Sequence, residues 1–417
     1  MPRADGGQRT NPDCHGWGSS VLFLLPLLEL AAAKKQAALS FLDPVAVGHS
    51  RLLPLAPGGR PAEVRTLSAE PPVFLLPGLL SEAEADELVA LAEASQWEKS
   101  LVNAGDESDG MRRALRKGGK SAFKTLRSFD TEPRDGFLAF AEMRDLAFSA
   151  FTIPNYDRAQ HAAFAAHVLG PGEAAVLANA GAAKLPLEAV GQADTYRYFT
   201  RLAREAPHLH SRFSSSTRLT YEAPLLQTLL ARTEAVTGLP EEVINSSEAL
   251  QVVHYPLRGH YACHHDSSPD NIDAGDVRLG TLAVFLNNVS LGGELAFPGA
   301  LRDGVDRSSW GNDEWASIEM KCQLTRACTR MGGLVLTPRK GDAVFWYNVQ
   351  RKALPAIVAR ASVPGTPKPV EGFGDDALIW GSLHCGAEVL EGEKWLANLW
   401  LRLPEAPLKG KRQGTEL

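Results

Sequence analysis

The stretch Tyr261-Ala262-Cys263-His264-His265-Asp266 sets what can be expected of this 417-residue chain. His264 and Asp266 are two positions apart, so on a strand their side chains point to one face while His265 points to the other. A third ligand must come from a distant segment, and His384 lies in the strand-like run Ser382-Leu383-His384. Two imidazoles and one carboxylate can hold one face of Fe(II) and leave its other positions open. We therefore predict a metal site formed by His264, Asp266 and His384.

Lys394 follows His384 by ten residues and opens the apolar run Trp395 to Trp400. An ammonium group in a closed pocket needs an anionic partner, because a buried unpaired charge is costly. A dicarboxylate that chelates the metal at one end would offer its other carboxylate to this lysine. The alternative is a surface lysine at a strand end. The presence of the metal motif in the same chain makes this alternative the weaker interpretation.

From Glu248 to Leu403 the chain resembles the prolyl 4-hydroxylase branch of the 2-oxoglutarate/Fe(II) dioxygenases. The motifs that carry the resemblance are Leu250-Gln251-Val252-Val253-His254-Tyr255, Tyr261 to Asp266, Gly292-Gly293-Glu294-Leu295-Ala296-Phe297-Pro298, Ser382-Leu383-His384 and Gly392-Glu393-Lys394-Trp395. The runs Phe285 to Val289 and Ala343 to Asn348 are most similar to the transmembrane members of the endoplasmic reticulum.

The resemblance implies a set of site residues. Iron would be bound by the three predicted ligands, with no catalytic side chain beyond them. Lys394 would pair with the C5 carboxylate of 2-oxoglutarate, helped by Tyr255 and Thr281. Tyr261, beside the metal motif, is the residue expected to contact the substrate proline.

The resemblance also implies an activity: hydroxylation of peptidyl proline at C4, with release of succinate and CO2. The cofactors would be Fe(2+), 2-oxoglutarate and L-ascorbate, and the partners O2 and a proline-containing protein or peptide. The catalytic part would then lie in the lumen of the endoplasmic reticulum, with membrane association through the N-terminus an open alternative.

The patterning predicts an α+β fold with a double-stranded β-helix, or jelly-roll, core. Its strands are expected at Leu250–Tyr255, Thr281–Leu286, Leu334–Thr337, Ala343–Tyr347, Leu378–Leu383 and Lys394–Leu403. Ser81 to Glu84 reads as a capping box at the start of a helix. A second helix is expected from Pro224 to Thr237, ending at Gly238. Such helices would buttress the sheet.

We expect five parts along the chain. They are a targeting or linker region (1–70), a first strand and helix of the oxygenase domain (71–100, with the strand near Val73 to Pro77), a helical insertion (101–210), the dioxygenase core (211–405) and a tail (406–417).

Within the insertion, residues 122–143 resemble an EF-hand. A helix ends at Phe129-Asp130, and Gly136 and Glu142 follow at loop-like spacing. Thr131 and Pro133 fall at positions that need oxygen ligands for Ca2+. We therefore predict a structural remnant of an EF-hand and regard Ca(2+) binding as doubtful.

The segment Val21 to Ala33 is apolar except for Glu29 and is followed by Lys34-Lys35. It is shorter than the roughly 20 residues that a membrane-spanning helix needs. It suits the apolar core of a secretory signal, while an amphipathic helix continuing to Leu39 is an equal alternative. The Pro- and Gly-containing stretch Pro54 to Pro61 is typical of a linker.

The five cysteines, Cys14, Cys263, Cys322, Cys328 and Cys385, have no zinc-site spacing. Cys263 and Cys385 are expected to face away from the metal as packed side chains. Cys322 and Cys328 could form a disulfide in an oxidising compartment. His254 and His260 are expected to be structural, and the turn-rich segment Gly299 to Gly333 to cover the substrate groove.

The net charge of −6 and the pI near 6.0 argue against nucleic acid as a partner. Two further functions remain open from the sequence. One is the same chemistry on another residue or on a small molecule, because loops set substrate choice. The other is a non-catalytic, calcium-responsive binding protein on the same fold, which the intact set of metal ligands disfavours.

Overall fold

The computed structural model describes residues 41–55, 61–100, 106–131, 133–170, 172, 184–300, 317–318, 322, 328–357 and 373–403. The chain divides into two compact units, Met1–Ser40 and Phe41–Leu417, and all described residues belong to the second. In the described ranges no helix is long and apolar enough to cross a membrane. The apolar segment 21–33 lies outside these ranges.

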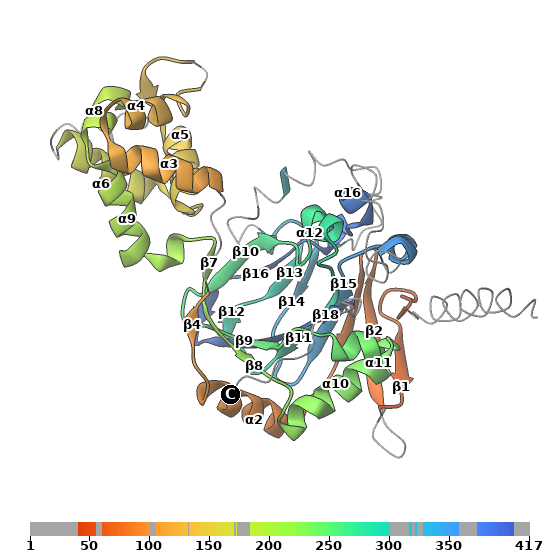
Figure 1. The fold of residues 1–417 in the computed structure, drawn as a ribbon. Coiled ribbons are helices and arrows are strands. Elements are labelled where there is room, and N and C mark those ends of the chain that lie inside the picture. The colour runs from red at the N-terminus through yellow and green to blue at the C-terminus, as the bar shows by residue number, and fades with distance from the viewer. Residues whose placement is uncertain are drawn as a thin grey trace, which may run out of the picture. The chain divides into compact units, whose positions relative to one another are not determined.

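Two antiparallel sheets form the centre of the second unit (Figure 1). The large sheet has the order β1 (Ser50–Leu53), β2 (Ala62–Ala69), β3 (Pro72–Leu76), β15 (Ala343–Tyr347), β11 (Arg278–Phe285), β18 (Lys394–Arg402), β9 (Leu250–Tyr255), β8 (Ser215–Leu219) and β4 (Glu98–Lys99). The small sheet has the order β14 (Leu334–Leu336), β13 (Leu295–Phe297), β16 (His384–Gly386), β10 (His260–His264) and β7 (Arg212–Phe213). A separate pair joins β12 (Leu291–Gly292) to β17 (Val389–Glu391).

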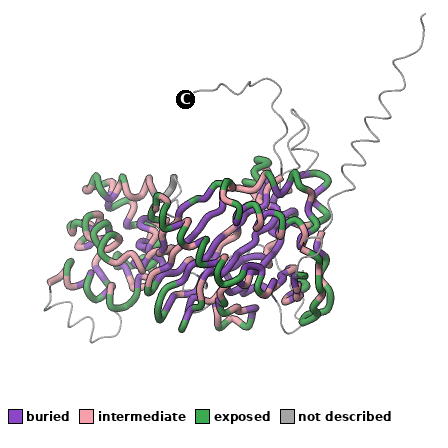
Figure 2. The backbone as a smooth tube through the Cα atoms, turned by 90° about the horizontal axis from the view of Figure 1, so that it is seen from below, coloured by how far each residue is buried: buried purple, intermediate pink, exposed green. Residues whose placement is uncertain are grey.

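The main core lies between the two sheets. Phe285 and Trp346 from the large sheet are buried in one apolar cluster with Leu295 and Phe297 from the small sheet. The rings of Phe297 and Trp346 meet edge to face with centroids 5.2 Å apart. Figure 2 shows the buried chain concentrated along these strands. The sheets are therefore held together by inward-pointing side chains, which occupy alternate positions along a strand.

Two predicted helices form as expected. In α2 (Glu82–Glu93), Ser81 and Glu84 make the reciprocal hydrogen bonds of a capping box. Helix α10 (Pro224–Thr237) ends at Gly238, whose positive φ of 66° suits glycine. Arg232 of α10 contacts Glu84 at 2.7 Å, which joins the two helices. Short helices complete this part: α11 (Glu241–Asn245), α12 (Pro269–Ala274), α16 (Phe373–Ala377), and the 3-10 turns η2 (Arg351–Ala353) and η3 (Trp380–Ser382).

The sheet begins earlier in the chain than we expected. Strands β1 and β2 precede the predicted first strand near Val73 and lie within the region interpreted as targeting or linker. In β2 the inward positions include Thr66 and Ser68, both buried. These polar side chains weaken the alternation of apolar residues that would have revealed the strand.

The predicted strand Leu378–Leu383 is also wrong. Its second half contains the 3-10 turn η3 (Trp380–Ser382), and the strand β16 begins only at His384. A Cβ atom at Gly381 would lie 2.9 Å from the Pro71 side chain, so the chain turns here where only glycine fits. An apolar run was mistaken for a strand because tertiary packing decides its shape.

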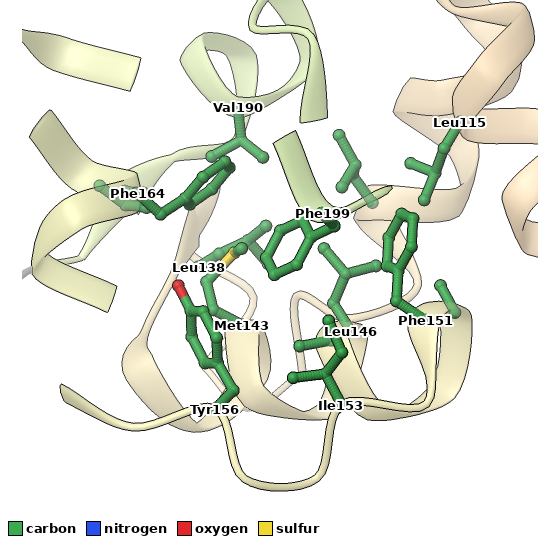
Figure 3. Close-up of a cluster of buried hydrophobic side chains, with 14 of the residues drawn as sticks. Leu115, Leu138, Met143, Leu146, Phe151, Ile153, Tyr156, Phe164, Val190 and Phe199 are labelled. Atoms are coloured by element: carbon green, nitrogen blue, oxygen red, sulfur yellow. The ribbon is translucent and has the colours of Figure 1, made fainter. Parts of the chain in front are cut away.

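The insertion is helical, as expected. Its elements are α3 (Asp106–Lys117), α4 (Gly119–Arg127), α5 (Phe140–Phe151), α6 (Arg158–Leu169), α8 (Leu187–Gln192), α9 (Thr195–Glu205), η1 (Pro207–Leu209) and the strand pair β5 (Phe137–Leu138) with β6 (Leu185–Pro186). They enclose an apolar core of their own, in which Leu146, Phe164 and Phe199 are fully buried (Figure 3).

In the EF-hand-like segment, carboxylate oxygens that could bind Ca2+ are bound by hydrogen-bond donors of the protein itself. The Glu142 carboxylate accepts hydrogen bonds from the Thr131 backbone, at 2.8 Å, the Thr131 hydroxyl and the Ala139 backbone. Lys184 contacts Asp135 at 2.5 Å. One oxygen of Asp130 accepts from the Gly136 backbone, and the other is buried without a hydrogen bond.

Candidate active site

The predicted metal ligands meet where β10 and β16 pair. His264 and His384 are directly opposite each other in the antiparallel register, and their ring centroids are 4.4 Å apart. Asp266 follows two residues after β10 ends. Its carboxylate oxygens lie 3.6 Å from Nε2 of His264 and 3.7 Å from Nε2 of His384. The ligand atoms of the three residues are all within 4.8 Å of one another, so one ion can contact them all.

Hydrogen bonds orient both imidazoles for metal binding. Nδ1 of His264 lies 2.9 Å from the Ala262 carbonyl oxygen, and Nδ1 of His384 lies 2.9 Å from the Ser382 carbonyl oxygen. A carbonyl oxygen only accepts, so each Nδ1 carries the proton and each Nε2 presents its lone pair to the site. Burial holds the pKa of His264 well below its usual value, which favours the neutral form that binds metal.

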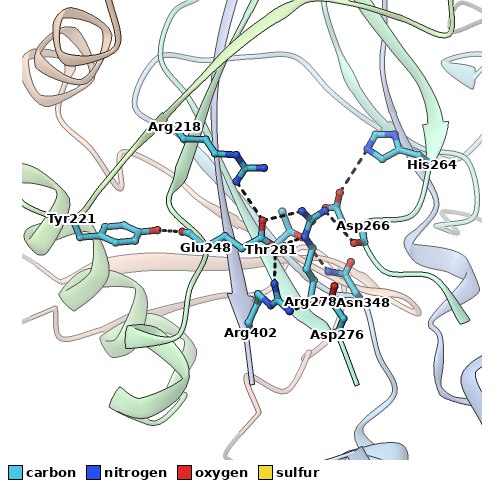
Figure 4. Close-up of polar contacts among 10 residues, drawn as sticks. All are labelled: Arg218, Tyr221, Glu248, His264, Asp266, Asp276, Arg278, Thr281, Asn348 and Arg402. Carbon is cyan, nitrogen blue, oxygen red and sulfur yellow. Dashed lines mark hydrogen bonds and ion pairs between the residues drawn. The ribbon is translucent and has the colours of Figure 1, made fainter. Parts of the chain in front are cut away.

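Thr281 and Asn348 support the carboxylate ligand. The Thr281 hydroxyl donates to Asp266 at 2.7 Å, and the Asn348 amide donates to the Thr281 hydroxyl at 3.1 Å (Figure 4). Thr281 thus contacts the metal-binding carboxylate directly, and its expected role toward 2-oxoglutarate remains a prediction. Asn348 could not be identified as a site residue from the sequence, because an asparagine at a strand end carries no distinctive sequence pattern.

A charged network adjoins the ligands (Figure 4). Arg278 donates to both carboxylate oxygens of Glu248, at 2.6 and 2.9 Å, and its guanidinium lies 3.7 Å from the centre of the Trp400 ring. Arg278 also contacts the Asp266 carbonyl oxygen at 3.4 Å. This paired arginine fixes the backbone next to the metal ligand. Arg278 could not be singled out from the sequence, because its partners are far from it along the chain.

Lys394 is buried, with 1% of its surface exposed, at the start of β18. Its ammonium lies 5.4 Å from the Tyr255 ring and 5.7 Å from the Phe285 ring. Burial lowers the pKa of Lys394 to about 8. Within the described part of the chain, no carboxylate forms an ion pair with this ammonium. A buried cation in such surroundings favours an anionic ligand.

Lys394 and the metal ligands line one cavity of about 540 Å³. The indole Nε1 of Trp346, which also lines it, is buried without a hydrogen-bond partner. A donor and a cation that have no partner among the described residues lie beside three oriented ligands, which suits a metal chelated by a dicarboxylate. Trp346 was missed because a tryptophan in a strand ordinarily packs in the core.

The predicted tyrosines line the same cavity. The Tyr261 ring stacks on His264 with centroids 3.6 Å apart, and the Arg212 guanidinium lies 4.4 Å from the centre of the Tyr261 ring. Tyr255 pairs with Lys394 across β9 and β18, and burial raises its pKa to about 12. Their contacts with substrate and 2-oxoglutarate remain predictions. Arg212 is a further lining residue that the sequence did not single out.

The remaining histidines make other contacts. His265 also lines the cavity, and its Nε2 lies 3.0 Å from the Trp380 carbonyl oxygen. His254 contacts Glu393 at 2.7 Å, and His260 contacts the His210 carbonyl oxygen at 2.7 Å. These contacts agree with structural roles.

Four cysteines are described, and all are free thiols: Cys263, Cys322, Cys328 and Cys385. The disulfide considered for Cys322 and Cys328 is therefore not formed in this structure. Cys263 and Cys385 belong to an apolar cluster on the side of the small sheet away from the ligands, as expected. The greater part of the predicted groove cover, Gly299 to Gly333, lies outside the described residues.

Comparisons with known proteins show what this chain is similar to. Residues 250–402 match the family model of the 2OG-Fe(II) oxygenase superfamily. The chain is 28% identical over 388 residues to the human transmembrane prolyl 4-hydroxylase, covering 88% of this chain and 70% of the relative. It is 31% identical over 175 residues to probable prolyl 4-hydroxylase 6 of Arabidopsis thaliana, covering 42% of this chain and 47% of the relative. The viral collagen prolyl hydroxylase of Paramecium Bursaria Chlorella virus-1, solved with 2OG, is 23% identical, with a TM-score of 0.27 and coverage of 45% of this chain and 78% of that one.

The matched residues include all three ligands and Lys394, so the chain is a 2-oxoglutarate- and Fe(II)-dependent dioxygenase. Within that class, its likeness over 88% of the chain to the human and mouse transmembrane prolyl 4-hydroxylases supports membership of the prolyl 4-hydroxylase family.

Proposed function

We propose that the chain hydroxylates peptidyl proline at C4. The observation that carries the proposal is the cavity that joins three oriented metal ligands to the unpaired, buried Lys394. The likeness to transmembrane and plant prolyl 4-hydroxylases supports proline as the target. Bound iron and 2-oxoglutarate would supply oxygen activation, in which 2-oxoglutarate and O2 give succinate and CO2 and one oxygen atom enters the substrate C–H bond.

The chain's own residues would bind and orient the reactants. Nε2 of His264 and of His384 and the Asp266 carboxylate would hold the metal, and Thr281 would fix the orientation of that carboxylate. Lys394 would pair with the far carboxylate of 2-oxoglutarate, beside Tyr255. The unpaired Nε1 of Trp346 is a further donor available to the cosubstrate.

Tyr261 is the residue we propose for the contact with proline. It lies on the His264 ring and is held by Arg212, so a pyrrolidine ring packed on it would be next to the metal. L-Ascorbate would restore iron oxidised in turnovers that do not hydroxylate a substrate. This cofactor is proposed from the family resemblance.

Finer features of the fold belong to the same proposal. The two antiparallel sheets with their shared core would form the double-stranded β-helix. The helices around residues 122–143 would be an EF-hand remnant that folds without Ca2+. The likeness to the transmembrane relative supports a place in the endoplasmic reticulum, with the N-terminal region as targeting signal or anchor.

The test is incubation of the full chain with Fe(II), 2-oxoglutarate, ascorbate and a panel of peptides. Proline-containing peptides should gain one oxygen atom, located at C4 by amino-acid analysis, with an equal amount of succinate. Matched peptides with alanine for proline should gain none. Oxygen in a lysine peptide or a small molecule, with none in proline, would redirect the proposal to another substrate of the same chemistry.

A further inference from the structure

The strands that carry the two histidine ligands also carry two cysteines on their other side. Cys263 precedes His264 in β10, and Cys385 follows His384 in β16. Successive strand residues point to opposite faces, so these thiols lie behind the iron site rather than in it. Cys322 and Cys328, which come from a separate segment of the chain, are buried with them. Four thiols thus meet in one place.

The sulfur atoms are close enough to share a ligand. Those of Cys263, Cys322 and Cys328 all lie within 4.8 Å of one another, and the Cys263 and Cys328 sulfurs are 2.8 Å apart. The thiol of Cys385 lies outside this group but neighbours those of Cys263 and Cys328 in the same buried cluster. A tetrahedral zinc ion with Zn–S bonds of about 2.3 Å separates its sulfurs by about 3.8 Å. Three of the sulfurs are therefore close enough to share one ion, and binding would require Cys263 and Cys328 to separate by about 1 Å and Cys385 to move toward them.

The surroundings select the kind of metal. The thiols are at most 4% exposed, and the side chains packed with them include Ala296, Ile318 and Leu383. Four soft sulfur ligands in an apolar shell suit zinc, whereas the mixed oxygen and nitrogen ligands across the sheet suit Fe(II). One strand pair would therefore present two chemically distinct metal sites on its two faces.

We propose that Cys263, Cys322, Cys328 and Cys385 bind a structural zinc ion. With four protein ligands the site has no open position, so its role would be to cross-link segments of the chain and not to catalyse a reaction. It would cross-link β10 and β16 to the segment that carries Cys322 and Cys328, and so hold in place the strands from which the iron ligands project. Paired disulfides are the competing arrangement. The sulfurs of Cys263, Cys322 and Cys328 lie together within 4.8 Å, and a shared position among three sulfurs favours one central ion over two separate pairs.

The test measures bound zinc in the full chain carrying His264→Ala and Asp266→Ala, which removes the second possible zinc site. After expression with zinc and exhaustive dialysis, elemental analysis should find about one zinc ion per chain. Adding Cys328→Ser should remove it. Adding Cys14→Ser, the same substitution at the cysteine that lies outside the described residues, should leave it bound.

Two further measurements keep the test decisive if Cys328→Ser folds poorly. Titrating the chain that retains its cysteines with an organomercurial should release the zinc as the thiols react. Replacement by Co2+ should give the intense thiolate-to-metal absorption of a tetrahedral sulfur site. A chain that holds no zinc, with its cysteines found by mass mapping as free thiols or as disulfides, would overturn the proposal.

Discussion

The iron site and the loop around Asp130 both contain charged side chains, but the two regions differ in whether these side chains have partners in the protein. At the iron site the Lys394 ammonium has no carboxylate partner among the described residues, and Nε1 of Trp346 has no acceptor. In the loop, Glu142 already accepts three hydrogen bonds and Asp135 is paired with Lys184. Only one oxygen of Asp130 is left without a partner. Groups without protein partners indicate a binding site better than a sequence motif does, because burying them is costly unless a ligand pairs with them.

The largest effect is expected from the iron ligands. His264→Ala, Asp266→Ala or His384→Ala should each abolish succinate production, because each removes one of three protein ligands on the metal. His265→Ala changes a neighbouring histidine whose Nε2 contacts the Trp380 carbonyl oxygen and which is not one of the three predicted ligands, so it should retain most of the activity. Near-normal turnover in any ligand variant would refute the metal assignment.

A smaller loss is expected at the residue that supports Asp266. Thr281→Val keeps the shape of the side chain and removes its hydrogen bond, so iron affinity should fall about 10- to 100-fold. Thr233→Val, which removes a buried hydroxyl from α10, is the matched control and should leave iron affinity unchanged. Iron affinity is measured by equilibrium dialysis. Equal affinities in Thr281→Val and the unmodified chain would show that the Thr281 hydrogen bond to Asp266 does not contribute to metal binding.

The pKa of Lys394 predicts how 2-oxoglutarate binding depends on pH. Below about 8 the ammonium is charged and pairs with the carboxylate. Above that pH the free protein must take up a proton to form the pair, so the half-saturating concentration should rise about tenfold per pH unit. Lys394→Arg, whose guanidinium stays charged, should remove this slope. A flat profile in the unmodified chain above that pKa would contradict the assignment.

The smallest effect is expected from the Asp130 loop. Full-length chain freed of calcium should give no heat of binding at Ca2+ concentrations of about 10⁻⁷–10⁻⁵ M. Glu142→Ala should lower the free energy of unfolding by about 1 kcal/mol, because it removes hydrogen bonds at the start of α5. Glu87→Ala at an exposed helical position is the control. A stoichiometric calcium isotherm that is lost in Glu142→Ala would show that the loop is a working site.

The sequence predicted the elements whose apolar pattern is regular. Strands β9 and β15 and helix α10 have the expected bounds, because the two strands are short, largely apolar runs and the apolar residues of α10 repeat with the helical period. Strand β2 escaped prediction because Thr66 and Ser68 point inward. The run Leu378–Leu383 was misassigned because its shape depends on Pro71, which is distant in sequence.

The site could be predicted only where ligands follow a motif. His264, Asp266, His384 and Lys394 lie at spacings that suit the chemistry, and the structure brings the first three together beside the fourth. Trp346 resembles an ordinary core residue. The cysteine cluster has no recognisable spacing, because its members come from two strands and a separate segment that meet only in the folded chain.

The central claim is that the metal ligands and Lys394 together hold 2-oxoglutarate. It is tested most directly by binding 2-oxoglutarate, without O2, to the Fe(II)-loaded unmodified chain, Lys394→Ala and Lys340→Ala. Lys340 is a partly buried lysine paired with Asp86, so its removal controls for the loss of one charge.

Removing one member of a buried ion pair costs about 3–5 kcal/mol. The account therefore predicts a dissociation constant at least about a hundredfold higher in Lys394→Ala. It predicts an unchanged constant in Lys340→Ala and equal iron content in all three proteins. Equal affinity for 2-oxoglutarate in Lys394→Ala and the unmodified chain would contradict it.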